Sequence, residues 1–370
     1  MGEAEEMMIH PGAIQLNAIA PYFTMFPLDF PLSLLQERAK RGERVLDPFC
    51  GRGTTNFAAR LLGLDSLGVD VNPVAVAITA AKLVSPTVEE ILAEAKRILA
   101  RPAPKDKPEG EFWTWAYHPA TLQDILRFRE AFLEESSSPV RLALRGLLLG
   151  ALHGPLKKPG TYLSNQAPRT YAPKPAYAVR FWRARGLKPP RVDVLEVLRR
   201  RAHRYYTHPL PELGKVLLGD SRRMETFKEE KEKFHWVITS PPYYGMRTYI
   251  ADQWLRYWFL GGPDSVSYGQ NSGMNHGSPE HFASDLAKVW NNIALQCEDG
   301  AVMVIRFGGI GSRKANPLGL LFESLGYTPW KVVEIRPVPP APRSRRQAIS
   351  FLREVDPQVT EWDCFCRLVG

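Results

Sequence analysis

The chain has 370 residues, a net charge of +9, 44% hydrophobic residues and 24% charged residues. These values exclude a mainly disordered or fibrous chain, and the length suggests two domains or one domain with a large insertion. No stretch approaches the roughly 18–20 apolar residues that a bilayer crossing needs, and the acidic N-terminus has no apolar signal segment. We therefore expect a cytoplasmic protein with no membrane partner.

The positive charge is concentrated in one segment. Residues 157–204 hold thirteen Lys or Arg against two acidic residues, so this segment carries +11 and the rest of the chain −2. A basic segment on a near-neutral body is typical of an element that binds polyanions. A solvated arginine-rich surface is the alternative, and composition alone does not choose between them.

Cysteines and histidines predict no metal site. The four cysteines are too few for a disulfide framework. Cys364 and Cys366 flank one residue in an apolar run, where two buried small side chains are favoured over a metal or redox pair. The histidines lack ligand spacing, and we expect His276 and His281, in a Gly/Ser/Asn-rich loop, to be solvated.

Strand and helix patterns alternate at both ends of the chain. Residues 44–84 predict a strand, a glycine-rich turn, a helix, a second strand and a second helix. Residues 85–213 are helical and irregular, with prolines expected to preclude regular structure over 157–183. Alternation resumes at 214, with strands predicted in GKVLLGD, FHWVITS, GAVMVIRFGG, WKVVEIRPV and EWDCFCRLV, and helices in RRMETFKEEKEK, ADQWLRYWFLGG and PLGLLFESLGY.

This alternation is typical of the α/β class, in which strands of a parallel sheet are joined by helices. We expect a doubly wound, mostly parallel sheet with a largely helical insertion. The predicted boundaries give one α/β domain from residues 1–84 and 214–370, and an inserted, mainly helical, basic domain from residues 85–213.

The first motif with chemical meaning runs from Asp47 to Thr54, DPFCGRGT, between a strand and a helix. Glycines at such a turn let a nucleotide-like ligand approach the backbone and the helix N-terminus closely. Asp47 can accept from an ammonium or amide of the ligand, and Asp70, ending the next strand, is placed to accept both ribose hydroxyls. Asn56 stands where a nicotinamide-binding motif needs its third glycine.

The second motif, Ser240-Pro241-Pro242-Tyr243, follows a later strand. Two prolines remove two backbone donors and leave carbonyl groups exposed as acceptors. The serine hydroxyl and a proline carbonyl suit the amino group of a planar ring, on which the tyrosine can stack. Taken alone, the motif is equally compatible with an ordinary proline-rich loop.

Together, the two motifs resemble motifs I and IV of the S-adenosylmethionine-dependent DNA amino-methyltransferases, which have the class I methyltransferase fold and modify exocyclic nitrogens of DNA bases. Residues 21–27 resemble their motif X, Gly219-Asp220-Ser221 stands in the place of motif III, and residues 249–255 resemble the segment after the catalytic loop. The resemblance covers 1–84 and 214–370, and the insertion does not resemble a common domain signature.

The resemblance implies S-adenosylmethionine as the cofactor and a base that leaves the DNA helix, because its amine cannot otherwise reach the methyl group. Ser240, Pro241, Pro242 and Tyr243 are then the catalytic residues, which position the amine for in-line transfer. The implied cofactor-binding residues are Phe26, Asp47, Phe49, Gly51, Gly53, Thr54, Asp70, Asn72, Asp220 and Ser221.

Within the resemblance, Ser240 indicates which base is methylated. In this family, Ser-Pro-Pro-Tyr is typical of cytosine-N4 enzymes and Asp/Asn-Pro-Pro-Tyr of adenine-N6 enzymes, so we expect a site-specific cytosine-N4 DNA-methyltransferase, with adenine-N6 second. Cytosine-C5 methylation is disfavoured because it needs a thiolate near this loop, and the loop has no cysteine. Many Ser-Pro-Pro-Tyr enzymes carry the two motifs in the opposite order, which sets this chain apart from them.

The basic insertion is interpreted as a target-recognition domain for double-stranded DNA, because it combines cations for phosphates with polar and aromatic side chains for bases. An RNA or protein amide methyltransferase and a non-catalytic nucleic-acid-binding protein are the alternatives. A companion restriction endonuclease, as in a restriction-modification system, fits the family, and the oligomeric state is not indicated. The predicted DNA contacts are Lys158, Asn165, Arg169, Tyr171, Lys174 and Arg180.

Overall fold

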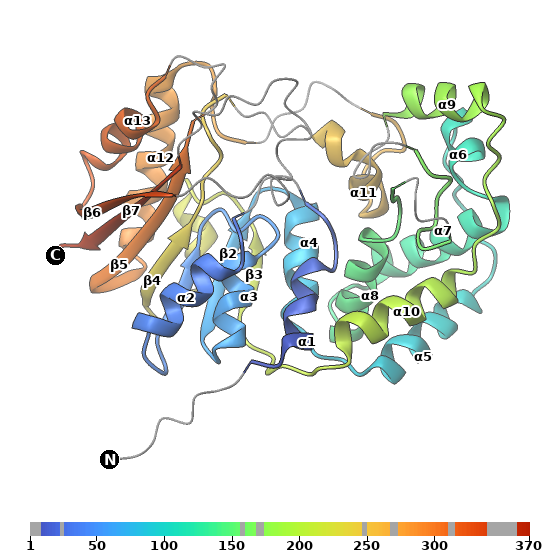
Figure 1. The fold of residues 1–370 in the computed structure, drawn as a ribbon, viewed down its shortest axis with the longest axis horizontal. Coiled ribbons are helices and arrows are strands. Elements are labelled where there is room, and N and C mark those ends of the chain that lie inside the picture. The colour runs from blue at the N-terminus through green and yellow to red at the C-terminus, as the bar shows by residue number, and fades with distance from the viewer. Residues whose placement is uncertain are drawn as a thin grey trace. The chain divides into compact units, whose positions relative to one another are not determined.

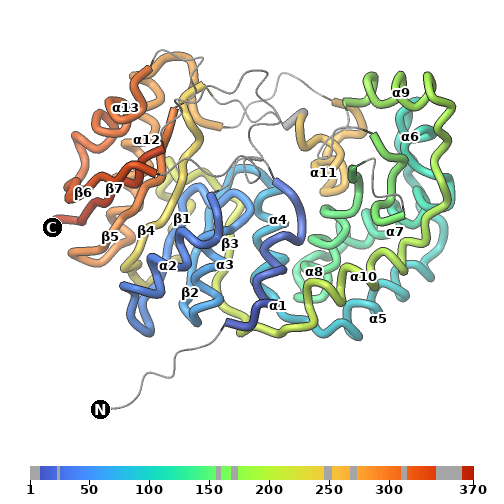
Figure 2. The backbone as a smooth tube through the Cα atoms, viewed as in Figure 1, coloured from blue at the N-terminus to red at the C-terminus, as the bar shows by residue number. Residues whose placement is uncertain are grey.

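A computed structural model describes residues 9–22, 26–155, 160–167, 174–245, 250–266, 273–309, 315–338 and 361–370. The chain divides into two compact units, each described here by itself. The sheet unit consists of residues 23–79, 213–248 and 272–370, and the helical unit of residues 1–22, 80–212 and 249–271. Figures 1 and 2 show the elements of both units.

The sheet unit contains a seven-stranded sheet in the order β3-β2-β1-β4-β5-β7-β6 (Figure 1). Its first five strands in this order pair in parallel, and β7 lies antiparallel between β5 and β6. This confirms the predicted doubly wound, mostly parallel α/β fold. The strands are β1 (Arg44–Asp47), β2 (Asp65–Asp70), β3 (Lys215–Leu218), β4 (Phe234–Thr239), β5 (Cys297–Gly308), β6 (Trp330–Val338) and β7 (Glu361–Leu368).

Helices cover the sheet, and not all of them were predicted from the sequence. Helix α12 (Pro279–Ala294) buries Phe282, Leu286 and Trp290 in a core that also contains Leu46 of β1 and Val237 of β4. The Ser278 side chain caps its N-terminus. The other helices of this unit are α2 (Asp29–Arg38), α3 (Thr54–Leu61), α13 (Pro317–Leu325) and the start of α4 (Pro73–Ala81).

The prediction of a polar helix after β3 is wrong. Only a short 3₁₀ helix, η2 (Met224–Phe227), forms there, and Phe227 is its one buried residue. The Lys/Glu-rich stretch that follows is largely exposed. Because a helix in a protein depends mostly on packing of an apolar face, a segment with so little apolar surface does not sustain one.

The helical unit is held together by apolar helix faces and an aromatic cluster. Phe112 and Trp113 of α6 contact Trp254 of α11, and Trp113 also contacts Trp258. Its elements are α1 (Pro11–Ile14), η1 (Gln15–Ala18), the end of α4, α5 (Val88–Leu99), α6 (Glu111–Ala116), α7 (Pro119–Glu134), α8 (Pro139–Leu149), α9 (Pro175–Ala184), α10 (Val194–Tyr206), η3 (Ile250–Gln253) and α11 (Trp254–Phe259).

Helix α9 corrects a second expectation, that prolines preclude regular structure over 157–183. Pro175 occupies the first turn of α9, where the missing N–H group has no helical partner to lose. Ala178, Val179 and Trp182 are buried on one side of the helix, and the Trp182 indole donates to the Gln166 carbonyl. The proline therefore starts this helix instead of preventing it.

The boundaries of the two units differ from those expected from the sequence, because the described residues 9–22 and 250–266 belong with the inserted helices. Arg201 of α10 is buried and donates to the Ile19 carbonyl, and Arg256 of α11 donates to the Leu149 carbonyl. The ends of the insertion also meet, since the Ser85 hydroxyl bonds to Leu210. The helical unit is thus assembled from three separate segments.

Candidate active site

The candidate site lies where β1 and β4 end. These strands are neighbours and pair in parallel, yet β1 leads to β2 on one side of the sheet and β4 leads to β5 on the other. In open α/β sheets, ligands bind in the crevice at such a switch point, outside the carboxyl ends of the strands. Strand β1 ends at Asp47 and β4 at Thr239, so both sequence motifs begin at this switch point.

The glycine turn after β1 is closely packed. Gly51 and Gly53 have φ angles of +51° and +69°, which glycine adopts at little cost. A Cβ atom on Gly53 would lie 2.4 Å from the side chain of Thr79, whose hydroxyl donates to the Gly51 carbonyl at 3.1 Å. Thr54, 3% exposed, then begins α3. The turn therefore brings bare backbone to the N-terminus of a helix, where N–H groups lack helical partners.

Asp70 at the end of β2 holds this turn. Its Oδ2 accepts from the Gly51 N–H at 2.9 Å and its Oδ1 from the Asn72 N–H at 2.8 Å. Burial raises the pKa of Asp70 to about 6, although these hydrogen bonds favour the charged form. The backbone N–H of Val71 is a third partner of this carboxylate. A carboxylate has about four acceptor positions, so Asp70 can hold the turn and still accept from a further donor.

Asp47 links the two motifs. Its Oδ1 accepts from the Thr239 hydroxyl at 2.7 Å and from the Phe49 N–H at 3.1 Å. Burial raises the pKa of Asp47 to about 6, and its hydrogen bonds oppose that shift. With 1% of its surface exposed, Asp47 joins β1 to β4, and its expected contact with a ligand ammonium stays a prediction.

The residues after β3 pack beside the turn. The Ser221 hydroxyl is buried and donates to the Pro48 carbonyl at 2.9 Å. Arg222 donates to both carboxylate oxygens of Asp220 and reaches Asp285 at 2.7 Å. Although partial burial opposes it, this pairing lowers the pKa of Asp220. The Asp220 carboxylate thus already binds a guanidinium group. Its expected contact with the adenine of the cofactor stays a prediction.

Phe49 and Asn72 flank the turn. The Phe49 ring is half-buried, with its edge toward Trp290 at a centroid distance of 6.1 Å. Asn72 is also half-buried, and its Oδ1 accepts from the Val74 N–H at the start of α4. Both side chains keep exposed surface beside Asp70, as their expected cofactor contacts require.

Phe26 belongs to the segment that resembles motif X, of which residues 23–25 lie outside the described part. Its half-buried ring meets Phe30 edge-on at 5.5 Å. The Arg306 guanidinium lies 3.7 Å from the centre of the Phe30 ring and pairs with both oxygens of Asp363. These contacts tie the start of α2 to β5 and β7, and the expected contact of Phe26 with the cofactor stays a prediction.

The loop after β4 is anchored through Tyr243. Ser240, Pro242 and Tyr243 are half-buried and Pro241 is buried. The Tyr243 hydroxyl donates to Glu361 Oε1 at 2.7 Å. Burial, together with the charge of Glu361, raises the pKa of Tyr243 well above its ordinary value. The phenol therefore stays protonated and serves as a fixed donor.

The Tyr243 ring rests on β5. A Cβ atom on Gly308 would lie 3.2 Å from the ring, so the absence of a side chain there lets the ring approach the strand. Phe307 meets the same ring edge-on at 5.5 Å. Glu361 opposes Gly308 in the β5–β7 ladder. Sequence reasoning missed Glu361, because nothing local connects it with a tyrosine 118 positions earlier.

His276 corrects a further expectation, since it is half-buried instead of solvated. Its Nδ1 accepts from the Gly245 N–H at 3.1 Å, and its ring stacks on Phe282 at 5.2 Å. Tyr244 packs against the same phenylalanine. His276 therefore fixes the end of the loop, whereas His281 is exposed, as predicted.

Among the predicted DNA contacts, Asn165 is the one that the structure does not support. The side chain is 7% exposed, and its amide donates to the carbonyls of Trp115 and Leu187. Because both amide hydrogens are used inside the helical unit, this group is not available to read a base. Asn165 is therefore a structural residue.

The other predicted DNA contacts are exposed or lie outside the described residues. Lys174 and Arg180, at the start and in the middle of α9, are exposed. The remaining three, Lys158, Arg169 and Tyr171, fall in 156–159 and 168–173, which the structure does not describe.

Cys364 and Cys366 are both free and buried, with their sulfur atoms 3.8 Å apart. They lie on β7, between β5 and β6. They thus occupy the core as small side chains, as the sequence favoured.

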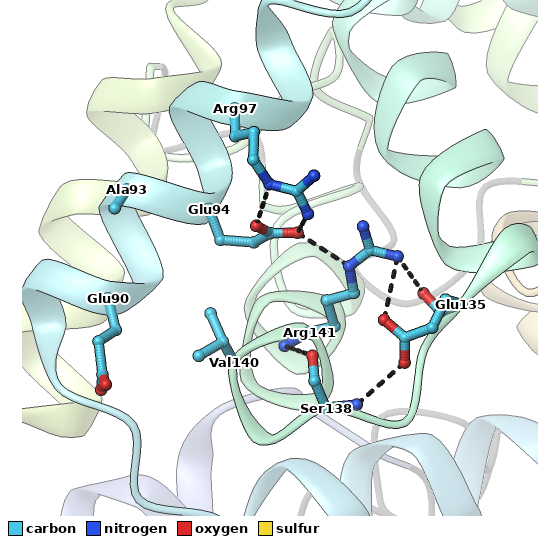
Figure 3. A pocket seen from close by; sticks show the side chains of 8 residues that line it. All are labelled: Glu90, Ala93, Glu94, Arg97, Glu135, Ser138, Val140 and Arg141. Carbon is cyan, nitrogen blue, oxygen red and sulfur yellow. Dashed lines mark hydrogen bonds and ion pairs between the residues drawn. The ribbon is translucent and has the colours of Figure 1, made fainter.

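Away from the site, the helical unit has a shallow pocket of about 420 Å³ between α5 and α8 (Figure 3). Its charged side chains satisfy one another, since Glu94 pairs with Arg97 and Arg141, and Arg141 pairs with Glu135. Within the described ranges there is no cluster of three or more side chains suited to a metal ion. In those ranges, too, no helix has the length and apolar character to cross a membrane.

The residues at the switch point fit S-adenosylmethionine. The cofactor needs a turn that a Cβ atom would obstruct, a helix N-terminus and an acceptor for ribose hydroxyls. Gly53 supplies the first, because a Cβ atom there would collide with the Thr79 side chain, on which the turn packs. Helix α3 supplies the second, and Asp70, which keeps an acceptor position beside its three backbone partners, supplies the third.

Comparison with known proteins gives one family match. Residues 8–81 match the family described as DNA methylase, N6_N4_Mtase. A stretch of 34 residues is 47% identical to the Type II methyltransferase M.BsoBI of Geobacillus stearothermophilus, which is 9% of this chain. That stretch spans 7% of the length of this curated relative.

The solved structures that are similar over most of the chain have low sequence identity to it, as two of them illustrate. The rRNA methyltransferase aviRa from Streptomyces viridochromogenes has a TM-score of 0.35 and 14% identity, over 99% of this chain and 93% of that one. An rRNA methylase from Streptococcus thermophilus has a TM-score of 0.34 and 8% identity, over 94% and 99%.

The family match covers the glycine turn, Asp70 and all of α4, and it includes the first of the two motifs on which the resemblance rested. It supports S-adenosylmethionine as the cofactor of this chain. The match therefore confirms the resemblance to the S-adenosylmethionine-dependent DNA amino-methyltransferases.

Proposed function

We propose that this protein is a site-specific DNA methyltransferase that methylates an exocyclic base amine, with cytosine N4 preferred and adenine N6 second. The observation that carries the proposal is the joining of the two motifs. The cofactor turn begins at the end of β1 and the Ser-Pro-Pro-Tyr loop at the end of the adjacent β4, and the Asp47–Thr239 hydrogen bond connects them at 2.7 Å.

The cofactor would be held by the turn and by the strand ends around it. Asp70 would accept the ribose hydroxyls, the backbone of Gly51 and Gly53 would lie along the cofactor, and Phe49 would offer an apolar surface. When bound, S-adenosylmethionine supplies an electrophilic methyl group. The residues of this chain would position the base amine that accepts this methyl group.

The loop after β4 would position the base. The Ser240 hydroxyl and the Pro241 carbonyl would accept hydrogen bonds from the amino group, leaving the nitrogen lone pair free for the methyl group. As the carbon–nitrogen bond forms, the carbon–sulfur bond to the cofactor would break, and one proton would leave the nitrogen for solvent water. The base reaches this loop only after it leaves the DNA helix, so the proposal includes base flipping.

Tyr243 would form one wall of the base site. Glu361 holds its hydroxyl and β5 supports its ring at Gly308, so the ring has few positions open to it. A stacking surface of fixed orientation lowers the conformational cost of holding a base. Tyr243 therefore combines a buried anchor with a side chain that keeps part of its surface exposed.

Double-stranded DNA is the proposed partner, bound through the basic insertion. Lys158, Lys174 and Arg180 are proposed phosphate contacts, and Arg169 is proposed to read guanine through its fork of donors. Tyr171 is the proposed aromatic contact. A companion restriction endonuclease is proposed from the family resemblance alone.

The test is methyl transfer from labelled S-adenosylmethionine to a pool of duplex DNA and, in parallel, to a pool of RNA. The DNA is digested to nucleosides and analysed by mass spectrometry. N4-methylcytosine is the expected product. N6-methyladenine would correct the base but keep the reaction, whereas transfer to RNA alone, or to neither pool, would overturn the proposal. The Ser240→Ala variant is the control, since it removes the hydroxyl acceptor but no cofactor contact.

A further inference from the structure

Helix α9 exposes a strip of aromatic and basic side chains that the core of the helical unit does not use. Trp182 on its buried side packs against Phe112 of α6, next to which α9 lies (Figure 1). Residues three and four positions apart share a helix face. The outer strip is formed by Lys174, Tyr177, Arg180, Phe181 and Arg185, of which all but Phe181 are exposed.

Three side chains of this strip stack on one another. The rings of Tyr177 and Phe181 lie nearly parallel, with centroids 6.4 Å apart, and the Arg185 guanidinium lies 4.0 Å from the centre of the Phe181 ring. Tyr177, at 42% exposed, ends the stack toward the start of the helix. Such cation–π and ring contacts restrain side chains that would otherwise move freely in water. These three side chains of the strip are therefore restrained before any partner binds.

The charge of this segment is not neutralised. Residues 174–192 contain six basic residues and no acidic residue. One of the six, Arg183, pairs with Glu111. Across the described part of the chain, Lys174, Arg180 and Arg185 form no ion pair with a carboxylate.

Helix α10 provides a contrast within the same unit. Its exposed cations Arg199 and Arg200 both pair with Glu196. The two arginine pairs carry equal charge, and all four side chains are exposed. Only the α10 pair forms ion pairs with a carboxylate. This difference makes the α10 pair a matched control for the α9 pair.

We propose that the outer strip of α9 binds duplex DNA, with the helix lying in the major groove. This rests on the proposed function and deepens it by naming the surface that meets the substrate. An α-helix is about 10–12 Å across with its side chains, and the major groove of B-DNA is about 12 Å wide. The major groove of A-form RNA is too narrow for side chains to read. The geometry thus favours duplex DNA over duplex RNA.

In this arrangement the two kinds of side chain have separate tasks. Arg180 and Arg185 contact phosphates, which gives affinity for every sequence and a dependence on salt. Tyr177, about one turn before Arg180, contacts base edges, where an apolar ring favours the thymine methyl group. Ala184 on the same side leaves room for the groove wall.

The experiment compares two double variants of the full chain, Arg180→Ala/Arg185→Ala and Arg199→Ala/Arg200→Ala, by fluorescence anisotropy. The probe is a pool of random 30-base-pair DNA duplexes, titrated at several salt concentrations. We expect the α9 variant to bind roughly 10- to 100-fold more weakly at 0.1 M salt and to lower the salt slope by about two. The α10 variant should bind within about threefold of the parent protein. Equal weakening by both variants, or by neither, would overturn the inference.

Two further measurements separate this inference from other readings. Tyr177→Ala should weaken DNA binding at an unchanged salt slope, and Tyr177→Phe should restore it. A duplex RNA of equal length should bind less tightly than DNA, and tighter RNA binding through the same arginines would overturn the assignment to the major groove. Methyl transfer is measured in the same preparations. If the parent protein methylates DNA and the α9 variant binds DNA with parental affinity, only this inference is wrong. If the parent protein methylates no DNA, the proposed function is wrong.

Discussion

Thr239 donates a hydrogen bond to Asp47 at 2.7 Å, and both side chains are buried. The two residues lie 192 positions apart in sequence and on adjacent strands of the sheet. A buried carboxylate that loses a donor retains its desolvation cost without compensation. This bond therefore matters both to the stability of the sheet unit and to the distance between its two motifs.

The Thr239→Val variant should lower the free energy of unfolding by about 1–3 kcal/mol at neutral pH, because it removes the donor while keeping the shape of the side chain. Urea unfolding of the parent and variant measures the difference. Thr239→Ser, which retains the hydroxyl, is the control and should lose less. Equal losses in both variants would show that the threonine methyl group, and not the hydrogen bond, is responsible.

Asp70→Ala should weaken S-adenosylmethionine binding by about 1.5–3 kcal/mol, because it removes the acceptor for the ribose hydroxyls and one partner of the Gly51 N–H. Calorimetry measures the affinity directly. Glu334→Ala is a suitable control, since Glu334 lies on β6 and pairs with Arg336. An Asp70→Ala variant that is folded and binds with parental affinity would remove Asp70 from the site.

Cofactor affinity should also depend on pH. Burial raises the pKa of Asp70 to about 6, and a ribose hydroxyl donates to the charged carboxylate. Protonation below about pH 6 should therefore weaken binding, by roughly tenfold for each further pH unit. The Asp70→Asn variant should bind more weakly than the parent at pH 7, with a flatter dependence on pH. A parent affinity that is constant from pH 7 to pH 5 would contradict this role.

The two raised pKa values also affect stability. Burial raises the pKa of Asp47 and Asp70 to about 6, above the ordinary aspartate value of about 3.9, so the folded state binds more protons between these values. The contribution of these groups to the free energy of unfolding is therefore full below about pH 4 and lost as the pH rises through 6. Urea unfolding of the cofactor-free protein measures it against Asp47→Asn, in which the contribution of Asp47 should vanish.

Tyr243→Ala should reduce turnover strongly while leaving cofactor affinity nearly unchanged, because the ring is assigned to the base. Tyr243→Phe and Glu361→Ala each remove the hydrogen bond but keep the ring, and both should reduce turnover less. The double variant should be no worse than either single variant, since all three lack the same bond. Additive losses, or a collapse of cofactor affinity in Tyr243→Ala, would contradict this division of roles.

The sequence predicted the elements whose signals are local. Strands β1, β2 and β4 are short apolar runs that end in polar residues, and the acids and loop that follow them could be placed at one edge of a parallel sheet. Helix α9 was missed because proline was read as a breaker, although at the first turn it is favourable. Helix α12 was missed because its first turn, which contains His281, was assigned to a Gly/Ser/Asn-rich loop.

Contacts between distant positions could not be predicted. Glu361 meets Tyr243 only because β7 enters the sheet beside β5, and strand order is not visible in a single sequence. Asn165 looked like a base-reading residue because asparagine in a basic loop has that chemistry. Its burial depends on the carbonyls of Trp115 and Leu187, which come from other parts of the helical unit.

The three-segment assembly of the helical unit has a consequence for how this chain can be divided. The chain passes between the two units at five places, after residues 22, 79, 212, 248 and 271. A single proteolytic cut in any one of these passages leaves the units tethered by the other four. Recombination of one contiguous stretch likewise cannot exchange the helical unit for another. We therefore expect new binding preferences to arise through substitutions on the surface of the helical unit, since the whole unit cannot be exchanged as one contiguous segment.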